Sequence, residues 1–153
     1  MSIFDPETFM SSEISGAMDT TVAPIPEGTY PAIVEDIKIR EVTGKDGSPR
    51  YPCEITWDIV DDNLKSNLGR DKITVRQTVW LDLLASGQLD NGKGKNIGVG
   101  KIRAAVNQND PNTRWNLNML KGAGPALVEV KHSPDRNDPS IVYGNVTKVG
   151  RLN

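Results

Sequence analysis

Residues 51–60 read YPCEITWDIV, a stretch in which apolar and polar side chains alternate from one end to the other. A period of two residues places successive side chains on opposite faces of a β-strand. The apolar face would carry Tyr51, Cys53, Ile55, Trp57 and Ile59, and the polar face Glu54, Thr56 and Asp58. We therefore predict a half-buried strand, with Trp57 in the core and Cys53 as a small buried apolar residue.

Strand-like patterns continue toward the N-terminus of this stretch. Residues 29–42 (TYPAIVEDIKIREV) are rich in β-branched residues, and a period of two puts Ile33, Ile37 and Ile39 on one side. The composition of residues 43–50 (TGKDGSPR) predicts a turn between the two strands. On the other side, residues 61–71 are polar and are predicted to form a connection.

Residues 72–84 (KITVRQTVWLDLL) alternate again and predict a third strand. Its inward face would carry Ile73, Val75, Val79, Leu81 and Leu83, and its outward face Lys72, Thr74, Arg76, Thr78 and Trp80. A tryptophan that faces outward among basic and hydroxyl residues is unusual for a strand. Trp80 is therefore either a platform for stacking a nucleobase or a lid on a small secondary core.

A short helix is predicted next, because Val99, Ile102 and Val106 recur at spacings of three and four. This helix should end near residues 107–111. Residues 113–124 (TRWNLNMLKGAG) predict a further helical turn, in which Trp115 and Met119 share a face and Gly122 ends the helix.

Two more strands are predicted at residues 125–132 (PALVEVKH) and 140–152 (SIVYGNVTKVGRL), joined by the turn-rich residues 133–139. The resulting order is strand, strand, strand, helix, strand, strand. That order is typical of the OB-fold, a five-stranded Greek-key barrel that binds oligonucleotides or oligosaccharides on the face of its second and third strands. Other small mixed folds share the order, so the topology alone leaves the fold open.

Residues 1–26 are predicted to be an extended N-terminal arm that precedes a barrel domain of residues 27–153. The arm lacks sustained periodicity and is rich in Ser, Thr, Asp and Pro. Asp5 and Pro6 can begin one helical turn, as N-cap and first helical residue. Near that turn the arm carries an apolar cluster: Ile3, Phe4, Phe9 and Met10.

The composition excludes several classes of function. No apolar run approaches the length of a membrane span. The single cysteine, Cys53, and single histidine, His132, exclude an internal disulfide and a cysteine metal cluster. No pairing of carboxylates suggests acid–base catalysis. We therefore expect a cytoplasmic protein that is not an enzyme and holds no metal or cofactor.

The net charge of −2 conceals an uneven distribution of charge. Residues 1–36 contain seven acidic residues and no Lys or Arg, whereas the remainder has 18 basic and 13 acidic residues. Residues 91–131 alone carry seven basic residues against two acidic ones. An acidic arm on a mildly basic body often accompanies contact with nucleic acid, although such an imbalance also arises by chance.

The glycine-rich residues 91–103 (NGKGKNIGVGKIR) do not form a nucleotide-binding P-loop. Five residues separate Gly94 from Gly100, and Ile102 occupies the position where a P-loop needs Ser or Thr. As an alternative, the glycines would let backbone amides approach the phosphates of a DNA strand, with charge from Lys93, Lys95, Lys101 and Arg103. The competing interpretation is a mobile loop with solubilising lysines.

Several candidate residues also have ordinary structural roles. Arg76 and Lys72 could pair across strands with Glu54 or Asp58 instead of contacting DNA. Trp115 could stack on a base, or pack beside Met119 on a helix face.

Most of the chain resembles a family of bacteriophage proteins. The matching segments are IPEGTYPAIVEDIKI, PRYPCEITWDIV, TVRQTVWLDL, LKGAGPALVEVKH and YGNVTKVGRL, within residues 24–152. That family is regarded as single-stranded-DNA-binding-like OB proteins, encoded beside phage replication and recombination functions. The resemblance implies a viral protein in the host cytoplasm that binds single-stranded DNA.

We accordingly expect a protein that binds single-stranded DNA with little sequence preference in phage replication or recombination. The expected binding residues are Lys72, Arg76, Trp80, Lys93, Lys95, Lys101, Arg103 and Trp115. The acidic arm would shield the DNA-binding groove that these residues form, or recruit replication and recombination proteins. The sequence leaves open whether the chain forms homo-oligomers. Two alternatives stand beside this one: a phage capsid-decorating or tail-assembly protein that uses its arm for protein contacts, and an OB-like domain that binds a replisome protein. Trp80 separates DNA binding from the structural role, because it would be exposed beside Arg76 in the first and buried under the arm in the second.

Overall fold

The computed structural model describes residues 3–18 and 24–152 of the chain. Residues 1–2 and 19–23 of the predicted arm, and the terminal Asn153, lie outside the described residues. The described chain is mainly β. Its five long strands are β1 (Gly28–Ile39), β4 (Pro52–Ile59), β5 (Thr74–Trp80), β6 (Ala126–Pro134) and β7 (Val142–Arg151).

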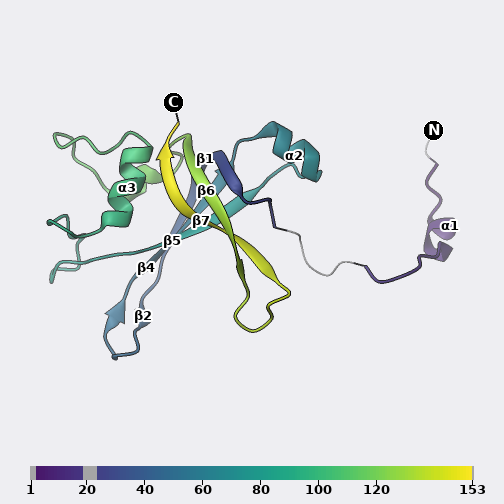
Figure 1. Ribbon diagram of the computed structural model, residues 1–153, viewed down its shortest axis with the longest axis horizontal. Helices are drawn as coiled ribbons and strands as arrows, with labels where there is room; N and C mark the ends of the chain where they lie inside the picture. Colours follow the sequence, from purple (N-terminus) through teal and green to yellow (C-terminus); the bar gives the residue numbers. More distant parts are fainter. Residues whose placement is uncertain (1–2, 19–23, 153) are drawn as a thin grey trace.

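These five strands form one sheet in the order β1-β4-β5-β7-β6, and β6 pairs back onto β1 so that the sheet closes (Figure 1). All of the pairings are antiparallel except that of β5 with β7, which is parallel and aligns Arg76 with Asn145. A small hairpin of β2 (Val42–Thr43) and β3 (Pro49–Arg50) extends from the connection between β1 and β4. The mainly β prediction with five principal strands is thus confirmed.

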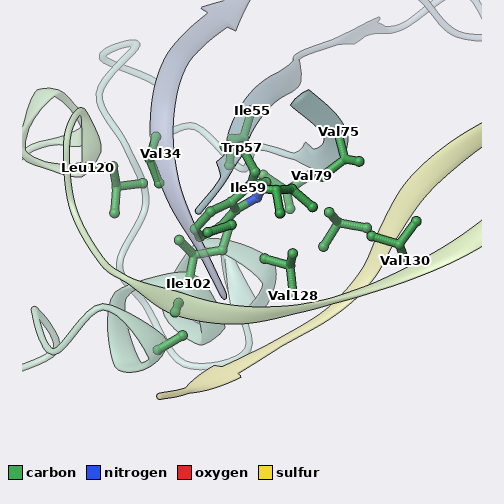
Figure 2. Packing of buried hydrophobic residues seen from close by; sticks show 14 of the residues in the cluster. Val34, Ile55, Trp57, Ile59, Val75, Val79, Ile102, Leu120, Val128 and Val130 are labelled. Carbon is green, nitrogen blue, oxygen red and sulfur yellow. The ribbon is translucent and has the colours of Figure 1, made fainter. Parts of the chain in front are cut away.

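The core forms around β4, whose alternation follows the prediction. Cys53, Ile55, Trp57 and Ile59 are all fully buried, and their neighbours Glu54, Thr56 and Asp58 are partly exposed. Figure 2 shows Trp57 packed among side chains of β1, β6 and the helix α3 (Ile97–Ala105). The indole Nε1 donates to Gln77 Oε1 at 2.9 Å, so the one polar group of this buried ring is satisfied.

The helix α3 packs on the barrel with the side predicted from the spacing of its apolar residues. Val99 and Ile102 are buried, together with Ala105. The helix ends at Ala105, slightly earlier than predicted, and Val106 is partly buried.

The predicted face of β1 is wrong in its N-terminal half and at its last residue, although Ile37 packs against the core as predicted. Ala32 and Val34 are buried, whereas Ile33 is only partly buried and Ile39 is 51% exposed. The register of β1 against β4 shifts between Val34 and Asp36, which is the signature of a β-bulge. An extra residue in one strand inverts the facing of every residue beyond it, so one alternation cannot describe the whole strand.

The polar connection at residues 61–71 contains a helix that the sequence analysis did not predict, α2 (Asp62–Leu68). Asp61 caps it by accepting a hydrogen bond from the Leu64 amide at 3.1 Å, and Leu64 is buried. Gly69 ends the helix in the left-handed region, with φ of 64°. The helix has only one buried residue, too few to produce a recognisable apolar period.

Two further boundaries differ from the prediction. The strand β5 ends at Trp80, so Leu81 and Leu83 lie in the following loop and are only partly buried. The predicted turn around Trp115 and Met119 is the 3₁₀ helix η1 (Leu117–Leu120), in which Leu120 is buried and Met119 is 40% exposed. The prediction that Trp115 and Met119 share a helix face is therefore wrong, because Trp115 precedes the helix.

The predicted helical turn of the arm is α1 (Pro6–Ser11), with Asp5 at its N-cap. Every residue in the range 3–18 is exposed. The barrel itself begins within the predicted arm, since Ile25 belongs to the core with only 3% exposure. No helix among the described residues is long and apolar enough to cross a membrane.

Candidate nucleic-acid interface

The exposed face of β5 carries the residues that its alternation predicts. Val75, Gln77 and Val79 face inward, so Thr74, Arg76, Thr78 and Trp80 point to solvent. Arg76 and Trp80 are four residues apart on this outer face, which in a strand corresponds to about 13 Å. The Trp80 side chain is 57% exposed, and the Arg76 side chain is 71% exposed. Neither side chain is buried beneath another part of the described chain.

A groove of about 790 Å³ lies beside Arg76, between β5 and the start of β7. Thr74, Thr78, Tyr143 and Asn145 line it with polar groups, and it also contains Arg70 and Glu54. We call it the β5–β7 groove. The parallel pairing of β5 with β7 creates it, because this pairing places Asn145 opposite Arg76.

Tyr143 is the aromatic side chain of this groove and is 50% exposed. Its hydroxyl donates to Asp135 Oδ1 at 3.2 Å, and this bond to a carboxylate raises the pKa of Tyr143 above its ordinary value. The bond also restrains the ring beside the groove. A restrained, half-exposed ring is suited to stacking, because little side-chain entropy remains to be lost on binding.

A second depression, of about 480 Å³, surrounds Trp80 at the end of β5. It is bounded by Arg50 and Tyr51 from the β2–β3 hairpin side and by the loop that follows Trp80. Trp80 lies opposite Pro52 in the register of β4 and β5. Together the two depressions follow the outer face of β5 from Trp80 to Thr74.

The predicted cations of this face take part in ion pairs. Arg76 Nη1 lies 3.4 Å from Glu54 Oε1, one of the two partners considered from the sequence. Lys72 pairs with Glu35 instead of Glu54 or Asp58. Glu35 is exposed because Ala32 and Val34 face inward, whereas the predicted alternation, with Ile33 and Ile37 inward, would have buried it. Exposed pairs of this kind contribute little to stability, typically less than about 1 kcal/mol, so a phosphate could displace either carboxylate at small cost.

The other predicted basic residues lie around α3, on a separate surface. Lys95, Arg103 and Trp115 line a depression of about 830 Å³, together with Arg114 and the carboxylates of Asp90 and Asp110. We call it the α3 pocket. Lys93 and Lys101 are exposed but do not line it. The α3 pocket shares Leu84 with the depression around Trp80, so the loop after β5 joins the two surfaces.

The side chains of Trp115 and Arg103 contact each other. The guanidinium carbon of Arg103 lies 4.3 Å from the centre of the Trp115 ring, a cation–π arrangement. Arg103 Nη2 donates to the Gln108 carbonyl at 3.0 Å, and Trp115 Nε1 donates to Gln108 Oε1 at 2.9 Å. One face of Trp115 is therefore covered, which leaves it less available for stacking than Trp80.

The glycine-rich stretch is held in place by Asn96, a residue that the sequence analysis did not single out. Asn96 is 8% exposed and left-handed, with φ of 51°. Its Nδ2 donates to the carbonyls of Asp82 and Asp90 at 2.8 and 2.6 Å, and its Oδ1 accepts from the Asp82 amide at 2.9 Å. Its own amide donates to Asp82 Oδ2 at 2.8 Å. The Asn96 side chain thus adds to the backbone bond from the Asp90 amide to the Asp82 carbonyl in closing this loop, and the amide at the start of α3 already has a carboxylate partner.

Arg50, Arg70 and Tyr143 also lie at this site without having been predicted there. Arg50 and Arg70 occur in polar segments where any cation looks like ordinary surface charge. The alternation of β7 did not determine the role of Tyr143. Their common feature is proximity to β5, which only the closed sheet provides.

The rest of the described chain adds no metal centre to this surface. No cluster of three or more His, Cys, Asp or Glu side chains that could hold a metal ion occurs within residues 3–18 and 24–152. Comparison with known proteins adds no family: no protein-family model matches the chain, and a search of curated proteins also returns no match.

Proposed function

We propose that the five-stranded sheet is an OB-fold barrel and that the protein binds single-stranded DNA with little sequence preference. The strand order supports the fold assignment, since the five long strands, counted along the chain, pair as first, second, third, fifth and fourth, and the fourth returns to the first. The helix α3 lies between the third and fourth of them in the chain. OB-folds bind oligonucleotides on the face of their second and third strands, which here are β4 and β5.

The observation that carries the proposal is the joint exposure of Trp80 and Arg76 on the outer face of β5. Proteins that bind single strands without sequence preference combine aromatic platforms with cations along a groove, and each stacked base contributes about 1–3 kcal/mol. Trp80 would supply the platform, and Arg76 would contact a phosphate about 13 Å further along the strand. Tyr143 would provide a second aromatic surface where the β5–β7 groove opens.

The charges of this surface predict moderate affinity. Arg50 and Arg76 flank Trp80 along the path, and Glu54 opposes part of their charge. Each phosphate contact to a single strand contributes about −0.7 to the slope of log K against log salt. Two or three such contacts would give a slope of roughly −1.5 to −2, which is shallow for a DNA-binding protein.

The structural alternative draws support from a different feature, the exposed apolar side chains of the arm. A virion protein that docks through its arm would need those side chains but not an exposed Trp80. Because Trp80 is exposed on the same face as Arg76 and no described residue of the arm covers it, the exposure favours DNA binding.

The test is a titration of the full chain with oligo-dT, followed by tryptophan quenching and by anisotropy of a labelled oligonucleotide at low and moderate salt. Trp80→Ala should weaken binding roughly 5- to 150-fold, the equivalent of 1–3 kcal/mol, and abolish most of the quenching. Arg76→Ala should weaken binding and make the salt slope shallower by about 0.7. Lys148→Ala, which removes an exposed cation of β7 outside both depressions, is the matched control and should change little.

Glu54→Gln provides a test in the opposite direction. This substitution removes the carboxylate that lies 3.4 Å from Arg76 and would also repel a phosphate, so oligo-dT should bind more tightly. If the wild-type protein shows neither quenching nor salt-sensitive binding at low salt, the DNA proposal is wrong.

A further inference from the structure

The arm contains a locally stabilised helical turn. Asp5 occupies the N-cap and Pro6 the first helical position, where its missing N–H and restricted φ favour the helix. Thr8 Oγ1 donates to Asp5 Oδ2 at 2.7 Å. The Phe4 and Phe9 rings, which flank the cap, pack with their centres 5.3 Å apart. A contact between the residue before the cap and the fourth helical residue is a hydrophobic staple, which fixes the entry of the chain into a helix.

This turn displays apolar side chains that have no place in the core of their own chain. Phe4, Phe9, Met10 and Ile14 are between 60% and 82% exposed, and Ile3 is fully exposed. Scattered apolar residues on a surface are ordinary, but a capped turn that presents several together resembles a recognition element. Its pre-formed conformation would reduce the entropy lost on docking.

The barrel carries an apolar groove that could receive such an element. Two depressions of about 300 and 490 Å³ adjoin, with Ile39 and Leu117 lining both. The larger one is mostly apolar and also contains Leu81, Leu83 and Trp115. We call the pair the Ile39 groove. It lies between the end of β1, the loop after β5 and the segment before η1, apart from the β5–β7 groove.

The charges of the two elements are complementary. Residues 3–18 contain Asp5, Glu7 and Glu13 and no Lys or Arg. Among the described residues that line the Ile39 groove, the single charged side chain is that of Lys121, and no carboxylate lines it. Arg50 and Arg114, both exposed, directly precede the lining residues Tyr51 and Trp115 in the chain, whereas Asp82 and Asp90 directly follow the lining residues Leu81 and Leu89. An acidic, apolar turn therefore matches an apolar groove whose lining includes a cation.

The described base of the arm, Pro24 and Ile25, lines the β5–β7 groove and not the Ile39 groove. Ile25 is buried, and its carbonyl lies 2.7 Å from His132 Nε2. In Figure 1, α1 lies on the side of α2, and α3 with its neighbouring loops lies on the opposite side of the barrel. A second copy can present its groove to the extended arm without any rearrangement of the barrel.

We propose that the helical turn of one chain docks in the Ile39 groove of a second copy, with Phe9 as its main apolar contact. Reciprocal exchange of an element between identical chains is a common route to dimers. The proposal does not require DNA binding, although the Ile39 groove shares Tyr51, Leu81 and Leu83 with the depression around Trp80.

The test is the mass of the full chain, measured by light scattering during size exclusion at high micromolar concentration. The wild-type protein should associate to a multiple of 16.7 kDa. Phe9→Asp in the arm and Ile39→Glu in the groove should each return the mass to 16.7 kDa. Both side chains are exposed, so the fold should tolerate the changes, which circular dichroism would verify. Ser15→Asp is the matched control, since it adds the same charge to the arm outside α1 without removing an apolar group, and it should still associate.

A complementation experiment identifies the contact as one between chains. Phe9→Asp retains an intact groove and Ile39→Glu retains an intact arm, so an equimolar mixture should recover association that neither variant shows alone. A wild-type monomer, or a mixture that stays monomeric, would overturn the proposal. A monomer whose tryptophan emission changes on Phe9→Asp would also overturn it, because the arm would then occupy the groove of its own chain.

Discussion

Replacing Asn96 with alanine should strongly destabilise the barrel. Asn96 is buried, adopts a left-handed backbone and makes three side-chain hydrogen bonds that hold Asp82 and Asp90 together. Alanine removes all three bonds and retains the unfavourable backbone conformation. The ends of the loop then keep only the bonds that backbone amides donate, from residue 90 to the Asp82 carbonyl and from residue 96 to Asp82 Oδ2.

The expected cost follows from these contacts. Each hydrogen bond contributes about 1 kcal/mol net, so three amount to roughly 3 kcal/mol. A left-handed backbone costs alanine about a further 1 kcal/mol, whereas glycine adopts it freely. Asn96→Ala should therefore lower the free energy of unfolding by about 4 kcal/mol, and Asn96→Gly by about 3 kcal/mol. For a chain of this length, 4 kcal/mol corresponds to a decrease in Tm of roughly 8–16 °C.

Thermal and urea unfolding, followed by circular dichroism, would measure both changes. Asn107 provides a matched control, because it is exposed and also left-handed, with φ of 66°. Asn107→Ala should cost only the backbone term, about 1 kcal/mol. If Asn96→Ala costs no more than Asn107→Ala, the hydrogen bonds do not close the loop and the reasoning is refuted.

Three further predictions concern the core and the arm base. Trp57→Ala should destabilise the protein by about 4 kcal/mol, because it empties a fully buried site and leaves Gln77 without its indole partner. Trp80 is exposed, so Trp80→Ala should cost no more than about 1 kcal/mol. Urea unfolding of the two variants makes the comparison. Burial raises the pKa of Cys53 to about 11, so the folded state favours the neutral thiol. The free energy of unfolding should therefore fall as pH rises from about 9 toward 11. Cys53→Ala should lose this dependence in pH-dependent melts. The amide of His132 donates to Glu27 at 2.8 Å and lowers the pKa of Glu27. The stability that this bond contributes should be present above the ordinary carboxyl pKa and be lost as pH falls through the lowered pKa. Glu27→Gln should therefore show less acid sensitivity than wild type in pH-dependent melts.

The strand β4 and the outer face of β5 could be predicted because their alternation is uninterrupted. The face of β1 could not, since the bulge between Val34 and Asp36 inserts a residue that no local pattern marks. The helix α2 was missed because it buries Leu64 alone. Asn96 was missed because its importance lies in contacts with Asp82 and Asp90, which are brought beside it only by the fold of the loop.

The amino-acid sequence by itself determined which side chains of β4 and β5 are buried, and therefore that Arg76 and Trp80 share an exposed face. That information is local, because the facing of a strand depends only on alternation along the chain. Only the tertiary structure decided what surrounds this face. The parallel pairing of β5 with β7 brings Tyr143 and Asn145 beside Arg76, and the β2–β3 hairpin brings Arg50 beside Trp80. Pairings between distant segments depend on closure of the whole sheet, so the groove is a property of the barrel and not of any one strand.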